Sequence, residues 1–250
     1  MCSPEPVCPL LIQFDQQIVV ITGGASGIGR ACADLFRAGG ATVLVLDRAG
    51  REPQTTGEEP GALHYYACDL AQPDQIAGTF DQIGKQFGRI NVLVNNAGIQ
   101  SYGNLAELTE EGWDQTLAIN TKAYFLCAKY ALPLLMATST PVIVNVASVK
   151  TQVCQDRELA YVTSKAAILG LTRSIATDYA PRLRCVTVSP GAVDTPLLQD
   201  EIRAHDQPEV ILEQTRNIHL LRRLAQADEV ANVIYFVASD KASFVTGHEY

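Results

Sequence analysis

A phenol and an ammonium group stand four residues apart, at Tyr161 and Lys165. Residues at this spacing share one face of an α-helix, so the two side chains lie together if the segment is helical. A phenol has an ordinary pKa of about 10 and is a poor base at neutral pH, but a nearby positive charge favours its ionised form. The pair therefore has the make-up of a proton-transfer site, although Tyr and Lys at this spacing are also common on helix surfaces.

A hydroxyl group is expected to join this pair from Ser148, which lies 13 residues before Tyr161. Ser148 follows the apolar run 141–146, which is typical of a buried strand. A hydroxyl at that place is positioned to hydrogen-bond a substrate oxygen and to stabilise charge that develops on it.

A second chemical feature is the glycine cluster Gly23, Gly27 and Gly29, between the β-branched run 18–22 and an amphipathic segment. Glycines let a backbone turn tightly and approach a phosphate, and a helix N-terminus presents unpaired N–H groups to it. Strand, glycine turn and helix in this order favour a dinucleotide-binding loop, whereas the glycines alone would also suit an ordinary tight turn.

A carboxylate supports the dinucleotide interpretation. Asp47 ends the apolar run 41–46 and lies 18 residues after Gly29. A carboxylate about 20 residues beyond the glycines accepts hydrogen bonds from a ribose 2′-OH and would repel a 2′-phosphate, which favours NAD. Arg48 leaves NADP as the alternative, because a guanidinium group accommodates phosphate.

The elements that must position these residues alternate between strand-like and helix-like patterns. Strands are predicted at 18–22, 41–46, 62–67, 91–94, 141–146 and 183–188, with helices after the glycines and at 73–87, 109–136 and 159–179. This alternation predicts a Rossmann-like α/β fold, a doubly wound parallel sheet in one domain. We expect a flexible tail at 1–13, the catalytic domain at 14–250, and a substrate lid at about 196–223, formed by an amphipathic helix pair. Ligands of such sheets bind beyond the carboxyl ends of the strands, where the polar clusters of this chain fall.

Composition excludes several other functions. The 250 residues carry a formal net charge of −8, which disfavours a nucleic-acid partner, and no apolar run reaches the roughly 18 residues of a membrane helix. The 7 cysteines form no C-x-x-C pair, and the start lacks the pattern of a signal peptide, so we expect a reducing, cytoplasmic location. The 4 histidines show no ligand spacing, and no metal centre is expected.

Taken in order, these motifs resemble the short-chain dehydrogenase/reductase family in its compact single-domain form. The resemblance extends from about Phe14 to Gly247 and implies NAD(P)-dependent interconversion of an alcohol and a carbonyl. It implies catalytic roles for Asn120, Ser148, Tyr161 and Lys165, with Asn120 holding a water in the proton path and Lys165 also gripping the nicotinamide ribose. The cofactor residues that it implies are Gly23, Ser26, Gly27, Ile28, Asp47, Asp69, Leu70, Asn95, Ala97, Gly98, Tyr161, Lys165, Pro190, Gly191, Val193 and Thr195. It also implies homodimers or homotetramers, and a final strand that this chain would hold only in truncated form.

The substrate is expected to be a small polar alcohol, such as a sugar, a polyol or a hydroxy acid. The stretches 100–102 and 151–157, which flank the expected substrate space, are unusually polar for a steroid or long acyl pocket. Ser148, Gln155, Arg157 and Tyr161 are the candidate substrate contacts, with Arg157 as an anion clamp or a solvated loop residue. Two alternatives remain open: an NADP-dependent ketoreductase, and a sensor or scaffold that binds NAD(H) without catalysis.

Overall fold

Six parallel strands form one sheet at the centre of the computed structural model, which describes residues 12–48, 61–203 and 205–250. The strands lie in the order β3-β2-β1-β4-β5-β6. Their bounds are β1 (Ile18–Thr22), β2 (Thr42–Asp47), β3 (Leu63–Ala67), β4 (Val92–Asn95), β5 (Val142–Val146) and β6 (Arg184–Val188). Every pairing between neighbours is parallel, so all six carboxyl ends meet at one edge of the sheet. The doubly wound α/β fold predicted from the alternating pattern is confirmed.

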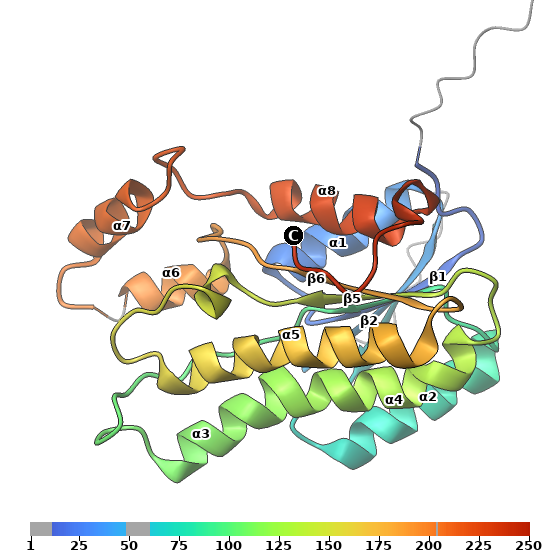
Figure 1. The fold of residues 1–250 in the computed structure, drawn as a ribbon, viewed down its shortest axis with the longest axis horizontal. Helices are drawn as coiled ribbons and strands as arrows, with labels where there is room; N and C mark the ends of the chain where they lie inside the picture. Colours follow the sequence, from blue (N-terminus) through green and yellow to red (C-terminus); the bar gives the residue numbers. More distant parts are fainter. Residues whose placement is uncertain (1–11, 49–60, 204) are drawn as a thin grey trace, which may run out of the picture.

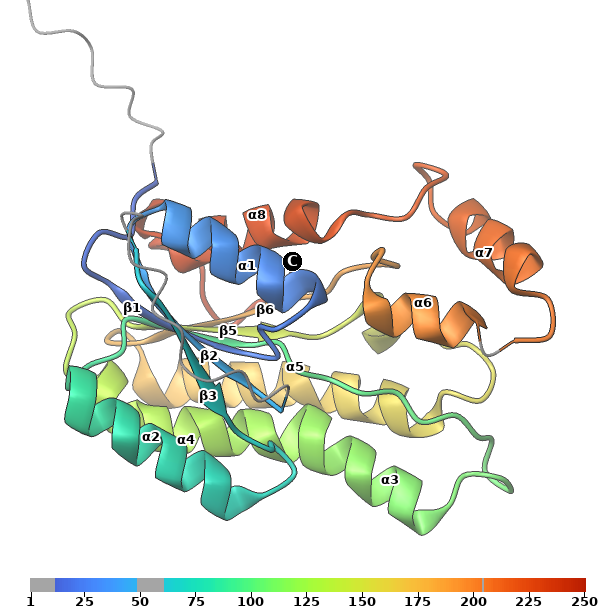
Figure 2. The ribbon, with the colours of Figure 1, turned by 180° about the vertical axis from the view of Figure 1, so that it is seen from behind.

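Helices cover both faces of this sheet (Figures 1 and 2). On one face lie α1 (Gly27–Ala38) and α8 (Ala227–Ala238), and on the other lie α2 (Pro73–Phe87), α4 (Ala123–Leu135) and α5 (Leu159–Tyr179). Successive strand residues alternate between the two cores: Val19 and Ile21 face the α1 side, and Val20 faces the α2 side. The continuous apolar runs of the strands follow from this burial on both faces.

One long helical region departs from the predicted pattern. Residues 109–136 form three consecutive pieces: α3 (Glu110–Leu117), a π-helical turn η1 (Ala118–Lys122) and α4. A π-turn holds more residues than an α-turn and is found frequently at functional sites. The apolar periodicity that predicted one helix does not reveal such a turn, because it changes the hydrogen bonding of a few residues only.

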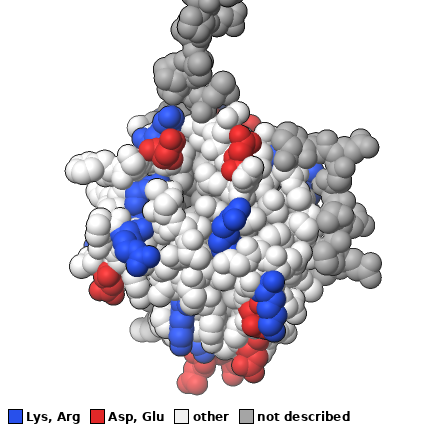
Figure 3. All heavy atoms as spheres, turned by 90° about the vertical axis from the view of Figure 1, so that its right-hand side faces the viewer, with Lys and Arg blue, Asp and Glu red and all other residues white. Residues whose placement is uncertain are grey.

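The stretch 196–223 contains two helices, α6 (Pro196–Arg203) and α7 (Pro208–Asn217), which form the predicted helix pair. They lie beyond the carboxyl ends of the strands, at one end of the molecule (Figure 1). At the opposite end, basic and acidic side chains are interspersed among uncharged ones (Figure 3). Within the described ranges, no helix has the length and apolarity to cross a membrane.

Both ends of the described chain contact the core. Of the expected tail at 1–13, only residues 12 and 13 lie within the described ranges, and the Ile12 carbonyl accepts a hydrogen bond from Tyr235 at 2.9 Å. Near the other end, the Thr187 amide donates to His248 at 3.0 Å, and the Tyr250 amide donates back to Thr187 at 3.0 Å. The residues after Gly247 thus form a short segment that pairs in parallel with β6, at the place of the expected last strand.

Arg184 of β6 holds the end of α8 and the chain at Val245. Its guanidinium group donates to the carbonyls of Val237 (2.8 Å), Val245 (3.2 Å), Ala238 (3.4 Å) and Ser239 (2.9 Å). We therefore expect Arg184→Met to lower the free energy of unfolding by about 2–4 kcal/mol, since several carbonyls lose their partner at once. Urea denaturation measures this change. Arg182→Met is the matched control, because Arg182 is exposed and makes one 3.3 Å bond to Met136, and equal losses in both variants would contradict the expectation.

Candidate functional site

Tyr161 and Ser148 meet at the carboxyl end of β5. Tyr161 lies in the first turn of α5, and Ser148 caps the short helix η2 (Val149–Thr151), where its hydroxyl accepts from the Lys150 amide at 3.2 Å. The Ser148 side chain also hydrogen-bonds the phenol of Tyr161. A buried hydroxyl and a phenol are therefore side by side, as the spacing predicted.

Lys165 lies beneath this pair, one helical turn further along α5. Its Nζ donates to the Val146 carbonyl at 2.9 Å, contacts the Tyr124 hydroxyl at 3.5 Å, and lies 5.7 Å from the centre of the Tyr161 ring. Tyr124 donates to the same Val146 carbonyl at 3.0 Å. Lys165 is only 3 % exposed, and the partners of its ammonium group are neutral dipoles.

Burial controls the ionisation of both groups. It raises the pKa of Tyr161 to about 12, and the nearby Glu158 and Glu201 carboxylates raise it as well, while the Ser148 hydrogen bond lowers it. Burial also lowers the pKa of Lys165 to about 8. In the protein alone, the desolvation of a phenolate therefore holds the Tyr161 pKa above its usual value. The lowering expected for this pKa includes the positive charge of bound NAD as well as that of Lys165. A positive charge placed close to the phenol would lower this pKa again.

Asn120 lies in the π-turn η1 and is fully buried. Its Oδ1 accepts from the Ile99 amide at 2.9 Å, and its Nδ2 donates to the Ile99 carbonyl at 2.9 Å and to Ser164 Oγ at 3.0 Å. Asn120 Oδ1 and Lys165 Nζ both lie 3.5 Å from the place where a Cβ on Gly98 would be. The fold thus brings Asn120, Lys165 and Gly98 into one small volume.

The glycine loop has the geometry of a phosphate cradle. Gly23 has a φ of +67°, and a Cβ on it would lie 2.8 Å from Ala97 Cα, while a Cβ on Gly29 would lie 2.2 Å from the Gly23 carbonyl oxygen. Ser26 caps α1 without a side-chain hydrogen bond, and the first turn, which includes Ile28, contains no acidic residue. The N-terminal amides of α1 are thus free of a side-chain cap, and the loop fits an anionic pyrophosphate.

Asn96 holds this cradle and was not among the predicted site residues. Its Nδ2 donates to the Thr22 carbonyl at 3.1 Å and to the Gly23 carbonyl at 3.2 Å. Its predicted neighbour Asn95 turns into the core instead and donates to Asn145 Oδ1 at 2.9 Å. The alternation of side chains at a strand end separates these adjacent amides, and the Asn-Asn pair gave no indication of which one faces the loop.

The other predicted cofactor residues lie along the same edge of the sheet. Asp47 Oδ2 accepts from the Ala25 amide at 3.0 Å, so this carboxylate lies against the glycine loop. Asp69 caps its own loop by accepting from the Ala71 amide at 3.0 Å, and Leu70 is buried in the core. A Cβ on Gly27 would lie 3.1 Å from Thr195, which brings the segment 190–195 beside the loop.

Two predicted substrate residues have partners elsewhere on the protein. Arg157 forms a 2.6 Å ion pair with Glu107, and Gln155 accepts a hydrogen bond from Lys150. The polar groups near Tyr161 are instead Glu158, which is 4 % exposed and lies 2.7 Å from Lys150 Nζ, and Glu201 of α6, which hydrogen-bonds Tyr102. Glu158 could have been predicted as a site residue, because it precedes Tyr161 by only three residues. Glu201 could not, because it is distant in sequence from the other residues of the site.

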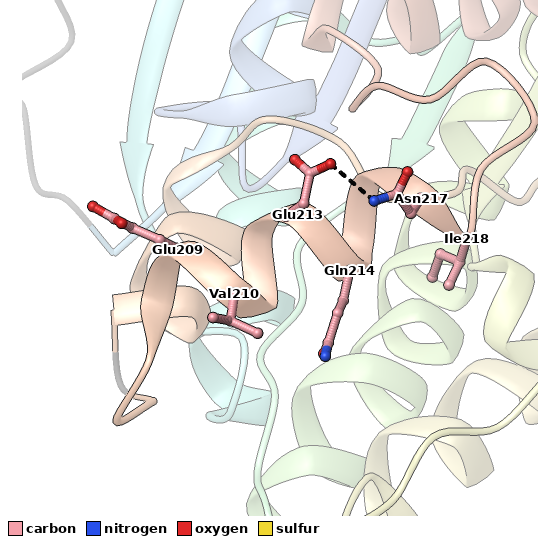
Figure 4. Close-up of a pocket in the computed structure, with 6 residues that line it drawn as sticks. All are labelled: Glu209, Val210, Glu213, Gln214, Asn217 and Ile218. Atoms are coloured by element: carbon pink, nitrogen blue, oxygen red, sulfur yellow. Dashed lines mark hydrogen bonds between the residues drawn. The ribbon is translucent and has the colours of Figure 1, made fainter.

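A hollow of about 530 Å³ lies along α7, away from these residues. Its lining comes from α7 and the residue that follows: Glu209, Val210, Glu213, Gln214, Asn217 and Ile218. In Figure 4, Val210, Gln214 and Ile218 point to one side of the helix, while Glu209 and Glu213 point to the other. The sides differ in polarity, as expected for an amphipathic helix, and none of the predicted site residues lines this hollow.

Comparisons with known proteins agree with this geometry. The family described as Enoyl-(Acyl carrier protein) reductase matches residues 23–250. An uncharacterized oxidoreductase of Thermotoga maritima is 37 % identical over 94 % of this chain and 95 % of its own, and dehydrogenase/reductase SDR family member 6 of Aquarana catesbeiana is 34 % identical over 95 % and 96 %. The ligand-free structure of Thermoplasma acidophilum aldohexose dehydrogenase superimposes with a TM-score of 0.85 at 36 % identity, covering 94 % of this chain and 92 % of that one.

The fold, the site and these similarities lead to one conclusion. Dehydrogenases of the matched group use NAD(P) and act on CH–OH groups, the chemistry that the Tyr161 and Ser148 pair suits. The chain is an oxidoreductase that belongs to the short-chain dehydrogenase/reductase family.

Proposed function

We propose that this protein interconverts a secondary alcohol and a carbonyl on a small polar substrate, with NAD as the cofactor. The observation that carries the proposal is the Tyr161 phenol, hydrogen-bonded to Ser148 above the buried Lys165 ammonium. The phenol supplies the proton-transfer group and the serine supplies the oxygen-binding group.

The residues divide the work between proton transfer and charge stabilisation. In the oxidative direction, Tyr161 Oη takes the hydroxyl proton of the alcohol, and in reduction it returns a proton to the carbonyl oxygen. The Ser148 hydroxyl donates to the substrate oxygen and holds it beside the phenol. Bound NAD supplies the hydride acceptor and a positive charge, which adds to that of Lys165 and favours the phenolate. Asn120 would keep a water in the path by which the proton leaves.

The glycine loop and its neighbours would hold the dinucleotide. Gly23, Ser26, Gly27 and Ile28 would bind the pyrophosphate, Asp47 the adenosine ribose, and Asp69 with Leu70 would border the adenine. Asn95, Ala97 and Gly98 would line the inner ribose, which Tyr161 and Lys165 would also contact. Pro190, Gly191, Val193 and Thr195 would meet the carboxamide. The uncapped start of α1 and the position of Asp47 against this loop support the assignment.

The side chains around Tyr161 favour an uncharged sugar or polyol. Glu158 and Glu201 bring negative charge close to the phenol, and Gln100 donates to Glu158 at 3.1 Å. Carboxylates accept hydrogen bonds from sugar hydroxyls and repel an anionic substrate such as a hydroxy acid. The similar aldohexose dehydrogenase is named for a substrate of this kind. The segment 196–223 would close over this substrate, with α6 contributing Glu201.

A homodimer or homotetramer in the cytoplasm is proposed as the working form. Phe125 on α4 and Leu159 on α5 are 48 % and 39 % exposed, which supports a contact through these two helices. The cysteines of the described residues are free thiols, in agreement with a reducing compartment.

The main rival function is an NADP-dependent ketoreductase. The exposed Arg48 beside Asp47 is suited to a 2′-phosphate, and 3-oxoacyl-[acyl-carrier-protein] reductase FabG of Thermotoga maritima is 34 % identical over 241 residues. Turnover of a substrate panel with each nucleotide separates the two functions.

Tyr161→Phe tests the catalytic assignment. We expect kcat for oxidation of the best sugar or polyol in a panel to fall by about 10²- to 10⁴-fold, because the proton acceptor is lost, while NADH still binds. Steady-state kinetics and NADH fluorescence titration measure the two effects. Tyr179→Phe, at the other end of α5, is the matched control, and a Tyr161→Phe enzyme with normal turnover would remove the basis of the proposed reaction.

Asp47 tests the choice of nucleotide. We expect Asp47→Asn to lower kcat/KM with NAD about tenfold and to raise it with NADP, since the charge that repels a 2′-phosphate is gone. Asp47→Ala should lose more with NAD, because the acceptor for the Ala25 amide is also removed. Asp74→Asn, at an exposed position of α2, is the control. An unchanged ratio of NAD to NADP efficiency in Asp47→Asn would show that this carboxylate does not select the cofactor.

Lys165 tests the stability cost of the buried charge. The Lys165 pKa is lowered from 10.5 to about 8, so burying the ammonium lowers the free energy of unfolding. This penalty is at its full size below pH 8 and fades as the pH rises toward 10.5. We expect Lys165→Met to be inactive, but its free energy of unfolding at pH 7 should be higher by about 1–3 kcal/mol. This gain is smaller than the pKa change alone would give, because the hydrogen bond to Val146 is lost. The gain should shrink by pH 10. Urea denaturation at both pH values measures it, with the exposed Lys129→Met as control, and a Lys165→Met gain that does not depend on pH would contradict the electrostatic cause.

A further inference from the structure

His219 connects the end of α7 to the segment 190–195. The residue follows α7 by two positions, and its side chain is half-buried. Ring Nε2 lies 3.0 Å from the Ala192 amide nitrogen, and Nδ1 lies 2.8 Å from the Thr215 carbonyl oxygen. One side chain therefore spans the lid helix and the backbone of the neighbouring segment.

The two partners determine which nitrogen carries the proton. An amide can only donate, so Nε2 must be the unprotonated acceptor for Ala192. The Thr215 carbonyl can only accept, so Nδ1 must carry the hydrogen. A neutral imidazole in this one tautomer satisfies both contacts, and a side chain with a single polar atom cannot replace it.

The ring also requires the glycine that precedes Ala192. A Cβ on Gly191 would lie 2.7 Å from His219 Nε2 and 3.1 Å from its Cδ2. Real Cβ atoms essentially never approach another atom to 2.7 Å, so the absence of a side chain at Gly191 lets the imidazole reach the Ala192 amide. The contact between His219 and Ala192 therefore depends on both the histidine and the glycine.

The segment that His219 holds contacts both halves of the site. The Pro190 carbonyl accepts from the Val149 amide at 3.1 Å, directly after Ser148, and Thr195 lies beside Gly27 of the phosphate cradle. Just after the expected lid, the Ala225 amide donates to the Ala192 carbonyl at 3.0 Å. Ala192 lies two residues from the Pro190 contact and three residues before Thr195, so a shift of Ala192 would be felt first beside Ser148.

We propose that His219 is a positioning residue, which couples the seating of α7 to the backbone geometry of 190–195 and thereby to the binding of the nicotinamide end of the dinucleotide. The inference rests on the proposed function in one respect, the assignment of 190–195 to the carboxamide. His219 itself does not touch the reacting atoms; it acts through the Ala192 amide.

Two amide substitutions separate the two contacts of the ring. In His219→Gln, the side-chain amide reaches about as far as Nε2 and keeps an acceptor for Ala192. In His219→Asn, the shorter amide ends near the position of Nδ1 and keeps only the side toward Thr215. Both variants are polar and of similar size, so a difference between them reports on the Ala192 contact rather than on the burial of the side chain. Asn217→Ala is the local control, since its exposed side chain bonds to Glu213 on the same helix.

Binding of NADH and of ADP-ribose is measured by titration on the full chain, alongside the KM for NAD and kcat. ADP-ribose contains every part of the dinucleotide except the nicotinamide. We expect His219→Asn to weaken NADH binding and to raise the KM for NAD about tenfold, the effect of one lost hydrogen bond, with ADP-ribose binding unchanged. His219→Gln and Asn217→Ala should both bind NADH like the wild type.

Equal NADH affinity in His219→Asn and the wild type would overturn the proposal. So would a parallel loss of ADP-ribose affinity, which indicates a general structural role, or a His219→Gln variant as weak as His219→Asn. These titrations need no turnover, so a wild-type protein that binds NADH but oxidises no alcohol would contradict the proposed function and leave the test of His219 intact.

Discussion

A buried positive charge is the constraint on which this site depends. Lys165 is 3 % exposed and is held by the Val146 carbonyl and the Tyr124 hydroxyl, which are dipoles rather than a carboxylate. A formal counter-charge would stabilise the ammonium better, but it would also cancel the field that the Tyr161 phenol experiences. Neutral partners let the lysine keep its electrostatic effect, at a cost in folding free energy.

The sheet supplies the geometry that makes this constraint useful. Parallel strands place the ends of β1, β2, β4, β5 and β6 at one edge, so the glycine loop, Asp47, Gly98, Ser148 and the segment 190–195 converge without long connections. The residues at this edge then fix one another: Asn96 holds the carbonyls of the glycine loop, and Val149 bonds to Pro190. The electrostatic centre is thus supported by backbone contacts from several strands.

Much of this arrangement could be predicted from the sequence, because it follows from periodicity and from motif order. The predicted helix at 73–87 coincides with α2, and Ser148, Tyr161 and Lys165 meet as their spacing indicated. What escaped prediction depends on the tertiary structure. The raised pKa of Tyr161 comes from burial, the divergence of Asn95 from Asn96 comes from side-chain direction at a strand end, and His219 contacts a segment 27 residues earlier in the chain. None of these effects leaves a local pattern.

The π-turn at η1 limits how the chain can change in length. Each residue of an α-helix turns the side-chain direction by about 100° around the helix axis. The extra residue in the π-turn therefore determines which way the side chains of α4 face relative to those of α3. Removing one residue from 118–122 would give a more regular helix with continuous hydrogen bonds. It would also rotate one flanking helix relative to the other, and either Asn120 would leave Ser164 or the buried face of α4 would turn toward solvent. The irregular turn therefore lets one continuous helical region bury the apolar face of α4 and also hold Asn120 against Ser164.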